Sequence, residues 1–473
     1  MNREEVLSWL RQSPAVDVLI IGGGINGIGA LRDLGLQGAD VLLVERGDFC
    51  SGASAASSHM VHGGIRYLEN GEFRLVREAV QERNRLIQNA PHYVTPLPTV
   101  IPLFKWFSGL FNSAFKFLGW LEKPAERGAV VIKAGLIMYD AYTGKQGAVP
   151  RHRLIMRRKS LAQFPDLNPR IIGTAHYYDG SMPSPERICI DLLADVVRDS
   201  AQARFVNYVG AVGGEGETVR LRDELSGETF TLRPQIVINA AGPWIDLTNQ
   251  ALGRESRLMG GTKGSHLVLD HPQLRQAIGD NEFFFENKDG RITLIFPLLD
   301  KVIVGTSDIF IDHPDDARCT EAEVDYFLDM IDVVFPAIEL SREHIVFRFS
   351  GVRPLPAANA KTAGQVSRDH SIEVIEAGAA LRYPILSLVG GKWTTFRAFA
   401  EQVTDVTLAR LGRQRRQSTA NLPIGGGRDY PSTASDRSRW CATVAAATGL
   451  SAERLALLLA RYGTRAADVA AFI

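Results

Sequence analysis

Residues 16–48 constrain the fold of this chain more than any other stretch. Residues 16–21, VDVLII, are apolar except for Asp17, as expected of a strand in a parallel sheet that is covered on both faces. Helical character follows over residues 26–36, and residues 41–44 form a second short apolar run. The order strand, turn, helix, strand predicts a βαβ unit, and therefore an α/β fold.

The turn inside this unit carries three glycines with the spacing G-x-G-x-x-G: Gly22, Gly24 and Gly27. Such glycines allow a tight turn, a close approach of backbone to a pyrophosphate, and close packing of helix on strand. The N–H groups at the start of the helix then face the phosphate. Glu45 follows the second strand, where a carboxylate can accept hydrogen bonds from a ribose. Together these features favour a dinucleotide site over a βαβ unit whose glycines only turn the chain.

The composition excludes several other classes of protein. The chain has 473 residues, enough for two or three domains, and its 53 basic residues balance its 53 acidic ones, so we do not expect nucleic-acid binding. Its 4 cysteines lie far apart without a C-x-x-C pair, which argues against a metal site or a disulfide framework and fits a reducing cytoplasm. We expect neither a signal peptide nor a transmembrane helix.

Three further segments have the character of cofactor contacts. Residues 47–68 are rich in Gly, Ser and Ala and follow the second strand directly. Residues 235–240 form another apolar strand that runs into the small-residue turn at Ala241 and Gly242. Residues 385–389 form a last apolar strand, after which 390–395, GGKWTT, are predicted to open a helix whose N-terminus stabilises a reduced flavin.

Residues 101–121 are unusually aromatic and include two lysines. An apolar face with Trp and Phe, flanked by basic side chains, is typical of an in-plane membrane anchor. A basic cluster follows at residues 151–159. The alternative is a buried helical hairpin with a solvated basic loop.

The remaining segments predict a second, antiparallel sheet. Residues 283–286 and 292–296 flank Asp289 and Gly290, a strong hairpin signal. A helix is expected over residues 321–334, and helices with a packing or capping role are expected after residue 412.

Several motifs, in order, resemble the FAD-dependent, respiratory-chain type of glycerol-3-phosphate dehydrogenase: GGGINGIG, HGGIRYLE, MYD, INAAGPW, KGSH, GTSD, FSGVRPL and GGKWTT. The resemblance covers residues 16–412 and implies a glutathione-reductase-like FAD-binding Rossmann domain, an antiparallel substrate domain and a short C-terminal helical segment. The implied FAD-binding parts are about 15–70, 165–260 and 350–412, the substrate-binding parts about 71–164 and 261–349, and the shortened helical cap 413–473.

The resemblance implies oxidation of sn-glycerol 3-phosphate to dihydroxyacetone phosphate, with electrons passed through FAD to membrane quinone. It also implies a protein held peripherally on the inner face of the cytoplasmic membrane, with the oligomeric state open and a homodimer as one option. The alternatives are a related FAD-dependent dehydrogenase or oxidase acting on another polyol phosphate or small hydroxy or amino compound, and a flavin-binding scaffold without turnover.

The implied site residues fall into two sets. The cofactor set is Gly22, Gly24, Gly27, Glu45, Ser54, Ser57, His62, Ala241, Gly242, Gly391, Lys392, Trp393, Thr394 and Thr395. The substrate set is Arg66, Tyr67, His266, Arg353, Arg368 and Lys392, with His266, Arg353 and Arg66 as the catalytic members.

The chemistry explains the residue types of the substrate set. Arginine forks and a lysine suit a phosphate dianion, so Arg353, Arg368 and Lys392 are the candidate clamp. His266 is the candidate base for the C2 hydroxyl, with a pKa expected near the working pH. Arg66 or Arg353 would stabilise the developing alkoxide.

Two departures from the family pattern concern the substrate side. His59 stands where the family usually has lysine, and residues 178–187 keep Arg187 but carry a proline-rich loop before it. Both leave the identity of the substrate more open than the fold or the cofactor.

Overall fold

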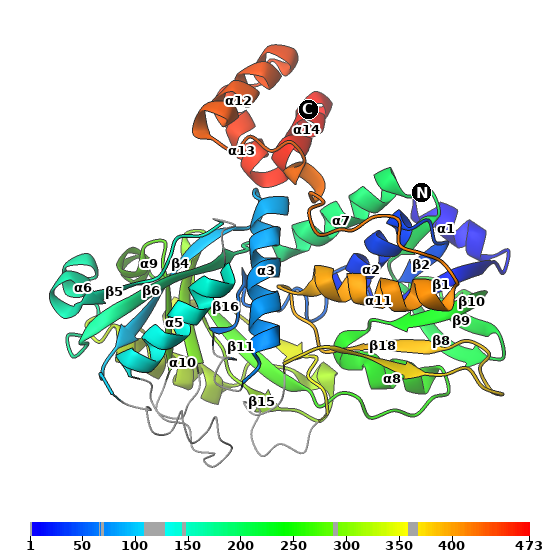
Figure 1. The fold of residues 1–473 in the computed structure, drawn as a ribbon, viewed down its shortest axis with the longest axis horizontal. Helices are drawn as coiled ribbons and strands as arrows, with labels where there is room; N and C mark the ends of the chain where they lie inside the picture. Colours follow the sequence, from blue (N-terminus) through cyan, green and yellow to red (C-terminus); the bar gives the residue numbers. More distant parts are fainter. Residues whose placement is uncertain are drawn as a thin grey trace.

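The computed structural model describes residues 2–65, 67, 71–107, 128–143, 148–286, 292–357 and 368–473. These residues form two lobes, each built on one sheet, and a small helical unit that projects from them (Figure 1). Helix α3 (Phe73–Asn89) stands between the lobes in this view. The expected fold class is confirmed: an α/β dinucleotide-binding domain, an antiparallel substrate sheet and a short C-terminal helical segment.

The first sheet is the dinucleotide-binding layer. Its strands run in the order β17 (Ser371–Ile375), β18 (Ile385–Val389), β10 (Thr229–Asn239), β1 (Ala15–Ile21), β2 (Val41–Val44) and β7 (Ala203–Val206). All these pairings are parallel except that of β17 with β18. The meander of β8 (Val209–Glu215) and β9 (Thr218–Asp223) continues from β10. Because five of these strands run parallel, the carboxyl ends of β1, β10 and β18 lie at one edge of the sheet, together with those of β2 and β7.

Both faces of this sheet are covered, as the apolar run of β1 predicts. Val18 and Ile20 pack on one face among residues of α2 (Ile25–Leu36), α7 (Pro185–Asp199) and α11 (Phe396–Arg410). Leu19 and Ile21 point to the opposite face, among residues of α1 (Arg3–Leu10) and the meander. Because side chains alternate along a strand, only a sheet buried on both faces needs every position apolar.

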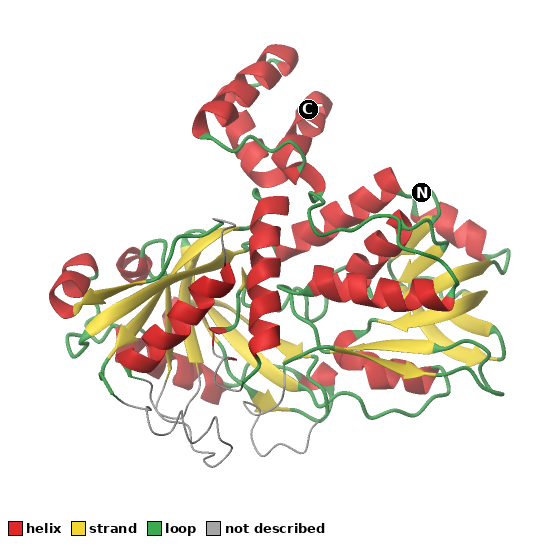
Figure 2. Ribbon diagram, in the orientation of Figure 1, coloured by secondary structure: helices red, strands yellow, loops and turns green. Residues whose placement is uncertain are grey.

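The second sheet is antiparallel except where β12 pairs with β4. Figure 2 shows helices on both of its faces: α6, α9 and α10 share one apolar core, and α3 and α5 share the other. The strands are β3 (Met60–Val61), β4 (Thr95–Leu103), β5 (Arg153–Met156), β6 (Gly173–Ser181), β11 (Thr262–Leu269), β12 (Glu282–Glu286), β13 (Ile292–Leu298), β14 (Lys301–Gly305), β15 (Ile309–Phe310) and β16 (Ile345–Arg353). The helices are α5 (Ala129–Thr143), α6 (Arg157–Gln163), α9 (Pro272–Ile278) and α10 (Glu321–Val334).

The C-terminal unit has its own small core and consists of α12 (Ala434–Thr448), α13 (Ala452–Tyr462) and α14 (Ala466–Phe472). It joins the body where Arg465 donates to Asp191 of α7 at 2.6 Å. Among the described residues, no single helix is long and apolar enough to cross a membrane. The pair 434–448 and 452–472 passes by length and composition only when combined, and it is bent by 113°.

Three local expectations differ from the structure. Residues 101–103 belong to buried strand β4, and residues 108–121 of the expected anchor lie outside the described residues. The helix after GGKWTT begins only at Phe396, because Gly390 and Gly391 adopt left-handed φ angles of 81° and 91°. Strand β6 pairs with β4, so the chain returns to the first layer after β6 rather than near residue 165.

Candidate active site

The glycine turn leaves no room for side chains. Gly22 has a φ of 112°, and a Cβ there would lie 2.6 Å from the carbonyl oxygen of Ala240. A Cβ on Gly27 would lie 2.0 Å from the carbonyl oxygen of Gly22, so only glycine lets α2 pack this close to the turn. Gly24 caps α2 without a side-chain hydrogen bond, which leaves the helix N-terminus facing the cavity for an anion.

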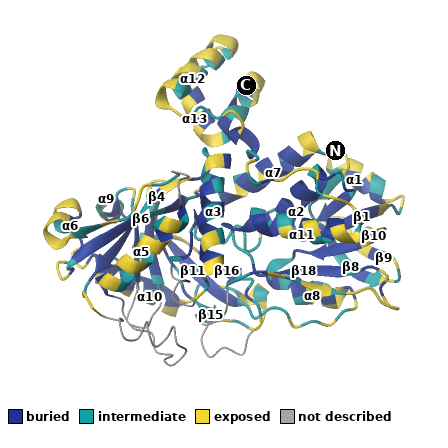
Figure 3. Ribbon diagram, viewed as in Figure 1, coloured by how far each residue is buried: buried dark blue, intermediate teal, exposed yellow. Residues whose placement is uncertain are grey.

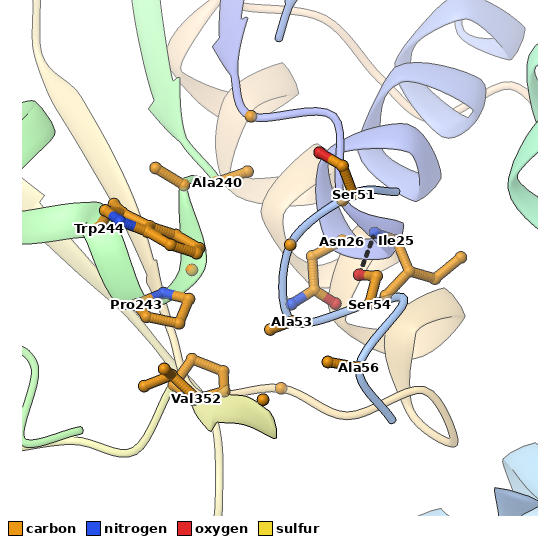
Figure 4. Close-up of a pocket in the computed structure, with 18 of the residues that line it drawn as sticks. Ile25, Asn26, Ser51, Ala53, Ser54, Ala56, Ala240, Pro243, Trp244 and Val352 are labelled. Atoms are coloured by element: carbon orange, nitrogen blue, oxygen red, sulfur yellow. Dashed lines mark hydrogen bonds between the residues drawn. The ribbon is translucent and has the colours of Figure 1, made fainter. Parts of the chain in front are cut away.

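Two side chains shape the edge of this turn. The Glu45 carboxylate accepts hydrogen bonds from the backbone N–H of Gly23 and of Gly47, both at 2.7 Å. Ser54 Oγ accepts from the Ile25 N–H at 3.0 Å, the dashed line in Figure 4. Glu45 therefore lines the cavity with two of its acceptor positions already used, and its remaining lone pairs are left to accept hydrogen bonds from a ribose.

The distant GGKWTT segment closes the cavity from the other side. The Trp393 indole N–H donates to the Ser54 carbonyl at 2.9 Å, which ties this segment to the serine-rich loop. A Cβ on Gly391 would lie 2.5 Å from the Asn26 amide nitrogen, so the first turn and the last one touch. Residues 22–26 and 390–393, far apart in the sequence, thus lie side by side in the cavity lining.

The resulting cavity has a volume of about 870 Å³ and runs from the first sheet to the second. Its lining includes most of the residues expected from the sequence: Gly22, Gly24, Glu45, Ser54, Ser57, His62, Tyr67, Ala241, Gly242, His266, Arg353, Arg368, Gly391, Lys392, Trp393 and Thr394. Gly27 and Thr395 lie behind this lining, Gly27 against Gly22 and Thr395 fully buried. Arg66 lies outside the described residues.

Sequence reasoning missed several lining residues. Asn26 at the start of α2, Arg46 and Trp244 all line the cavity, as does the strand segment 209–212, while Ser58 falls inside the predicted contact segment 47–68. Arg46 stacks over the Trp244 ring at 5.0 Å (Trp244 is labelled in Figure 4). Asn26 could have been found from its place inside the glycine motif, whereas Trp244 and Arg46 become neighbours only through the tertiary fold.

His266 lines the cavity from the second sheet, on β11. Its Nε2 is 2.9 Å from Ser58 Oγ, its ring stacks on Phe349 at 4.8 Å, and its Nδ1 meets no hydrogen-bond partner among the described residues. Burial, together with the positive charge of Arg353, lowers the pKa of His266 to about 3. The expected pKa near the working pH is therefore wrong for this state, because the ring has lost its water and faces a cation.

Arg353 and Arg368 share one carboxylate. Arg353 donates to Asp308 Oδ1 at 3.0 Å, and Arg368 donates to Asp308 Oδ2 at 2.7 Å. Arg353 also donates to the Thr306 hydroxyl and the Ser307 carbonyl, both at 2.8 Å. Burial of Asp308 would raise its pKa, but the two guanidinium groups outweigh this and lower it. Asp308 thus holds the guanidinium groups of Arg353 and Arg368 close to each other.

Lys392 completes the cationic end. Its Nζ lies 3.9 Å from the centre of the Tyr67 ring. Burial lowers the pKa of Lys392, Tyr67 opposes this, and the charge of Arg368 lowers it further. His62 is half-buried here, and desolvation together with the charges of Lys392 and Arg368 lowers its pKa to about 3. Each of these shifts would be offset by an anion bound at this end.

A buried network supports the segment that carries Asp308. Glu323 of α10 accepts from Lys263 Nζ at 2.6 Å, from Ser265 Oγ at 2.8 Å and from Ser307 Oγ at 2.5 Å. These bonds join β11, with its KGSH motif, to the GTSD segment. Burial opposes ionisation of Glu323, but these donors lower its pKa to about 2. Glu323 was not predicted from the sequence, because nothing local connects α10 to the site.

Comparison with known proteins places this geometry in a family. A family model described as FAD dependent oxidoreductase matches residues 17–397. A glycerol-3-phosphate dehydrogenase of Synechocystis sp. is 35% identical over 98% of this chain and 82% of that protein. A D-erythritol 1-phosphate dehydrogenase of Brucella abortus is 33% identical over 82% of this chain and 72% of that protein. The structure of a Bacillus halodurans glycerol-3-phosphate dehydrogenase with FAD has a TM-score of 0.72 at 24% identity, covering 99% and 79% of the two chains.

The fold and the cavity define an FAD-dependent oxidoreductase, and FAD is its cofactor. The glycine cradle, the open N-terminus of α2 and a cavity of about 870 Å³ fit that group. More narrowly, the chain belongs to the FAD-dependent glycerol-3-phosphate dehydrogenase family.

Proposed function

We propose that this protein oxidises sn-glycerol 3-phosphate to dihydroxyacetone phosphate. The observation that carries the proposal is the convergence of Arg353, Arg368 and Lys392 beside His266 at one end of the cavity. In their ionised forms, these three cations exceed Asp308 by two positive charges, which matches a phosphate dianion. A histidine beside the three cations also favours a substrate that carries a hydroxyl group close to its phosphate.

The residues have separate tasks in this reaction. The arginine forks and Lys392 hold the phosphate and so place the C2 hydroxyl near His266. The neutral His266 ring accepts the hydroxyl proton, and the bound phosphate offsets the Arg353 charge and raises the pKa of the ring from its low value. FAD, when bound, supplies the hydride acceptor. Arg353 stabilises the negative charge that develops on the oxygen.

A second candidate is oxidation of a longer polyol phosphate. The two departures from the family pattern touch each other: His59 Nδ1 lies 2.9 Å from the Pro183 carbonyl, and the Met182 N–H donates to the His59 carbonyl. His59 also packs edge-on against Phe349, the ring on which His266 stacks. A changed pocket edge beside the base would alter which polyol fits, and the Brucella abortus relative carries the name of an erythritol phosphate dehydrogenase.

Anaerobic mixing of the holoenzyme with single substrates tests the proposal. Glycerol 3-phosphate should bleach the flavin absorbance within seconds, and glycerol, which lacks the phosphate, should not. Faster bleaching by D-erythritol 1-phosphate would favour the second candidate. No bleaching by any phosphorylated polyol would refute both.

We further propose that the protein rests on the inner face of the cytoplasmic membrane and passes electrons to quinone. The support is an apolar stripe on the outer side of α5: Val130, Ala134, Ile137, Met138 and Ala141, all exposed (Figure 3). Trp106 and the 71% exposed Phe107 adjoin it, because the Val130 N–H donates to the Trp106 carbonyl. The exposed basic residues of 151–159 would be attracted to the anionic lipid of that leaflet.

Sedimentation with anionic liposomes tests the membrane proposal. Ile137→Asp should release the protein to the supernatant, whereas Leu225→Asp, a matched change at an exposed leucine of the first lobe, should not. Equal sedimentation of wild type and Ile137→Asp would contradict it. Reoxidation of the reduced flavin by a short-chain quinone, at a rate well above that with oxygen, tests the acceptor.

A further inference from the structure

A buried group of polar side chains holds the turn that follows strand β3. The backbone N–H of Gly63 donates to Tyr139 Oη at 2.9 Å and to Asp179 Oδ1 at 3.0 Å. The Tyr139 hydroxyl in turn donates to Asp179 at 2.5 Å. Tyr139 comes from α5 and Asp179 from β6, so two elements far apart in the sequence meet at one amide.

Arg83 completes this group from a third element, α3. Its side chain is fully buried, and it donates to Tyr139 Oη at 2.8 Å, to the Tyr178 carbonyl at 2.7 Å and to Asp179 Oδ1 at 3.3 Å. Burial raises the pKa of Asp179, and Arg83 opposes that rise. The guanidinium and the carboxylate therefore depend on each other, since either one alone would be a buried unpaired charge.

The turn around Gly63 contacts the GGKWTT segment through residues on either side of Gly63. Immediately before Gly63, the His62 N–H donates to Thr394 Oγ1 at 3.1 Å, and the Thr394 hydroxyl donates to the His62 carbonyl at 3.2 Å. Shortly after it, the Tyr67 ring lies against Lys392 Nζ. The turn thus meets the GGKWTT segment at two points, and both points line the cavity.

We propose that Asp179, Tyr139 and Arg83 are positioning residues for substrate oxidation, which set the turn around Gly63 so that Tyr67 and His62 hold Lys392 and Thr394 in place. None of the three lines the cavity, so each acts through the turn and not on the substrate. The fit at this amide is close: a Cβ on Gly63 would lie 2.2 Å from Tyr139 Oη, so the Tyr139 hydroxyl lies directly against the turn. The inference rests on the proposed function for its kinetic readout only.

The test compares Tyr139→Phe with Tyr93→Phe in the FAD-loaded protein. Tyr93 is a matched control, because it is a buried tyrosine that donates to a buried aspartate, Asp191, at 3.1 Å but contributes nothing to the turn. Hydrogen exchange of the Gly63 amide should be at least tenfold faster in Tyr139→Phe and unchanged in Tyr93→Phe. The FAD content of the two variants should be equal.

Steady-state kinetics give the second readout. In Tyr139→Phe, KM for the phosphorylated substrate should rise about tenfold or more, with kcat falling less, because Lys392 is no longer held under Tyr67. Asp179→Asn should show a larger effect of the same kind, and if it does not fold, Tyr139→Phe still decides. Unchanged exchange at Gly63, or faster exchange with unchanged KM, would overturn the proposal. Exchange needs no substrate, so a wild type that fails to oxidise polyol phosphates would refute the proposed function without affecting the exchange result.

Discussion

Replacing Glu282 with glutamine should stabilise the protein near neutral pH and not in acid. Glu282 lies on β12, fully buried, where it accepts a hydrogen bond from the Thr99 hydroxyl at 2.8 Å. Burial, with a contribution from the nearby Asp179, raises the pKa of Glu282 from 4.5 to about 8. The carboxyl group of Glu282 therefore stays protonated in the folded protein at pH 7. The positive charge of Arg83 then neutralises only one buried carboxylate, that of Asp179.

The sign and the size of the effect follow from proton linkage. Between pH 4.5 and 8 the folded state keeps a proton that the unfolded chain has released, so the wild type loses stability as the pH rises. Each pKa unit corresponds to about 1.4 kcal/mol, and pH 7 lies 2.5 units above 4.5, so the loss is roughly 3 kcal/mol at pH 7. Glutamine cannot ionise and still accepts the Thr99 hydrogen bond.

Urea unfolding of both proteins at pH 5 and pH 7.5 measures the difference. We expect nearly equal stability at pH 5 and a clear advantage of Glu282→Gln at pH 7.5. The pH 5 pair is the internal control, because it carries any packing cost of the amide. A stability difference of the same size at both pH values would show that Glu282 is ionised in the folded protein. It would refute the conclusion that Glu282 is neutral beside the Arg83–Asp179 pair.

Three other substitutions test the site directly. Arg353→Ala should lower kcat/KM at least a hundredfold with FAD retained, because the guanidinium proposed to hold the phosphate is lost and each charged hydrogen bond is worth about 1.5–3 kcal/mol. Arg353→Lys should recover only part of this, and near-normal turnover would reject the clamp. Gly27→Ala should release FAD and lower the melting temperature, because its Cβ would overlap the Gly22 carbonyl; absorbance of the purified protein at the flavin band checks this, and full occupancy would contradict it. Asp308→Asn should lower the inhibition constant of inorganic phosphate roughly tenfold, about 1.4 kcal/mol, because the Asp308 carboxylate competes with phosphate for Arg353 and Arg368. Weaker inhibition would mean that Asp308 matters more for orienting the two arginines than for competing with the anion.

The first βαβ unit is the part of the fold that the sequence predicted best. Its strand, helix and second strand appear as β1, α2 and β2 within one residue of the expected bounds, because apolar runs and glycine spacing act over a few neighbouring residues. The motif order also pointed to the family, since HGGIRYLE, SGVRPL and GGKWTT are specific strings. The helix after GGKWTT was placed too early, because its two left-handed glycines were read as part of the helix.

Contacts between distant residues came only from the tertiary structure. Asp308 joins Arg353 to Arg368, and Asp179 meets Gly63 across 116 positions of sequence, yet no local pattern marks either aspartate. The low pKa of His266 likewise depends on burial and on the Arg353 charge, both of which exist only after folding. The sequence by itself determined the cofactor-binding unit and the family. The tertiary arrangement of the two lobes decided which charges line the cavity together, because burial and through-space distance set the strength of their interactions.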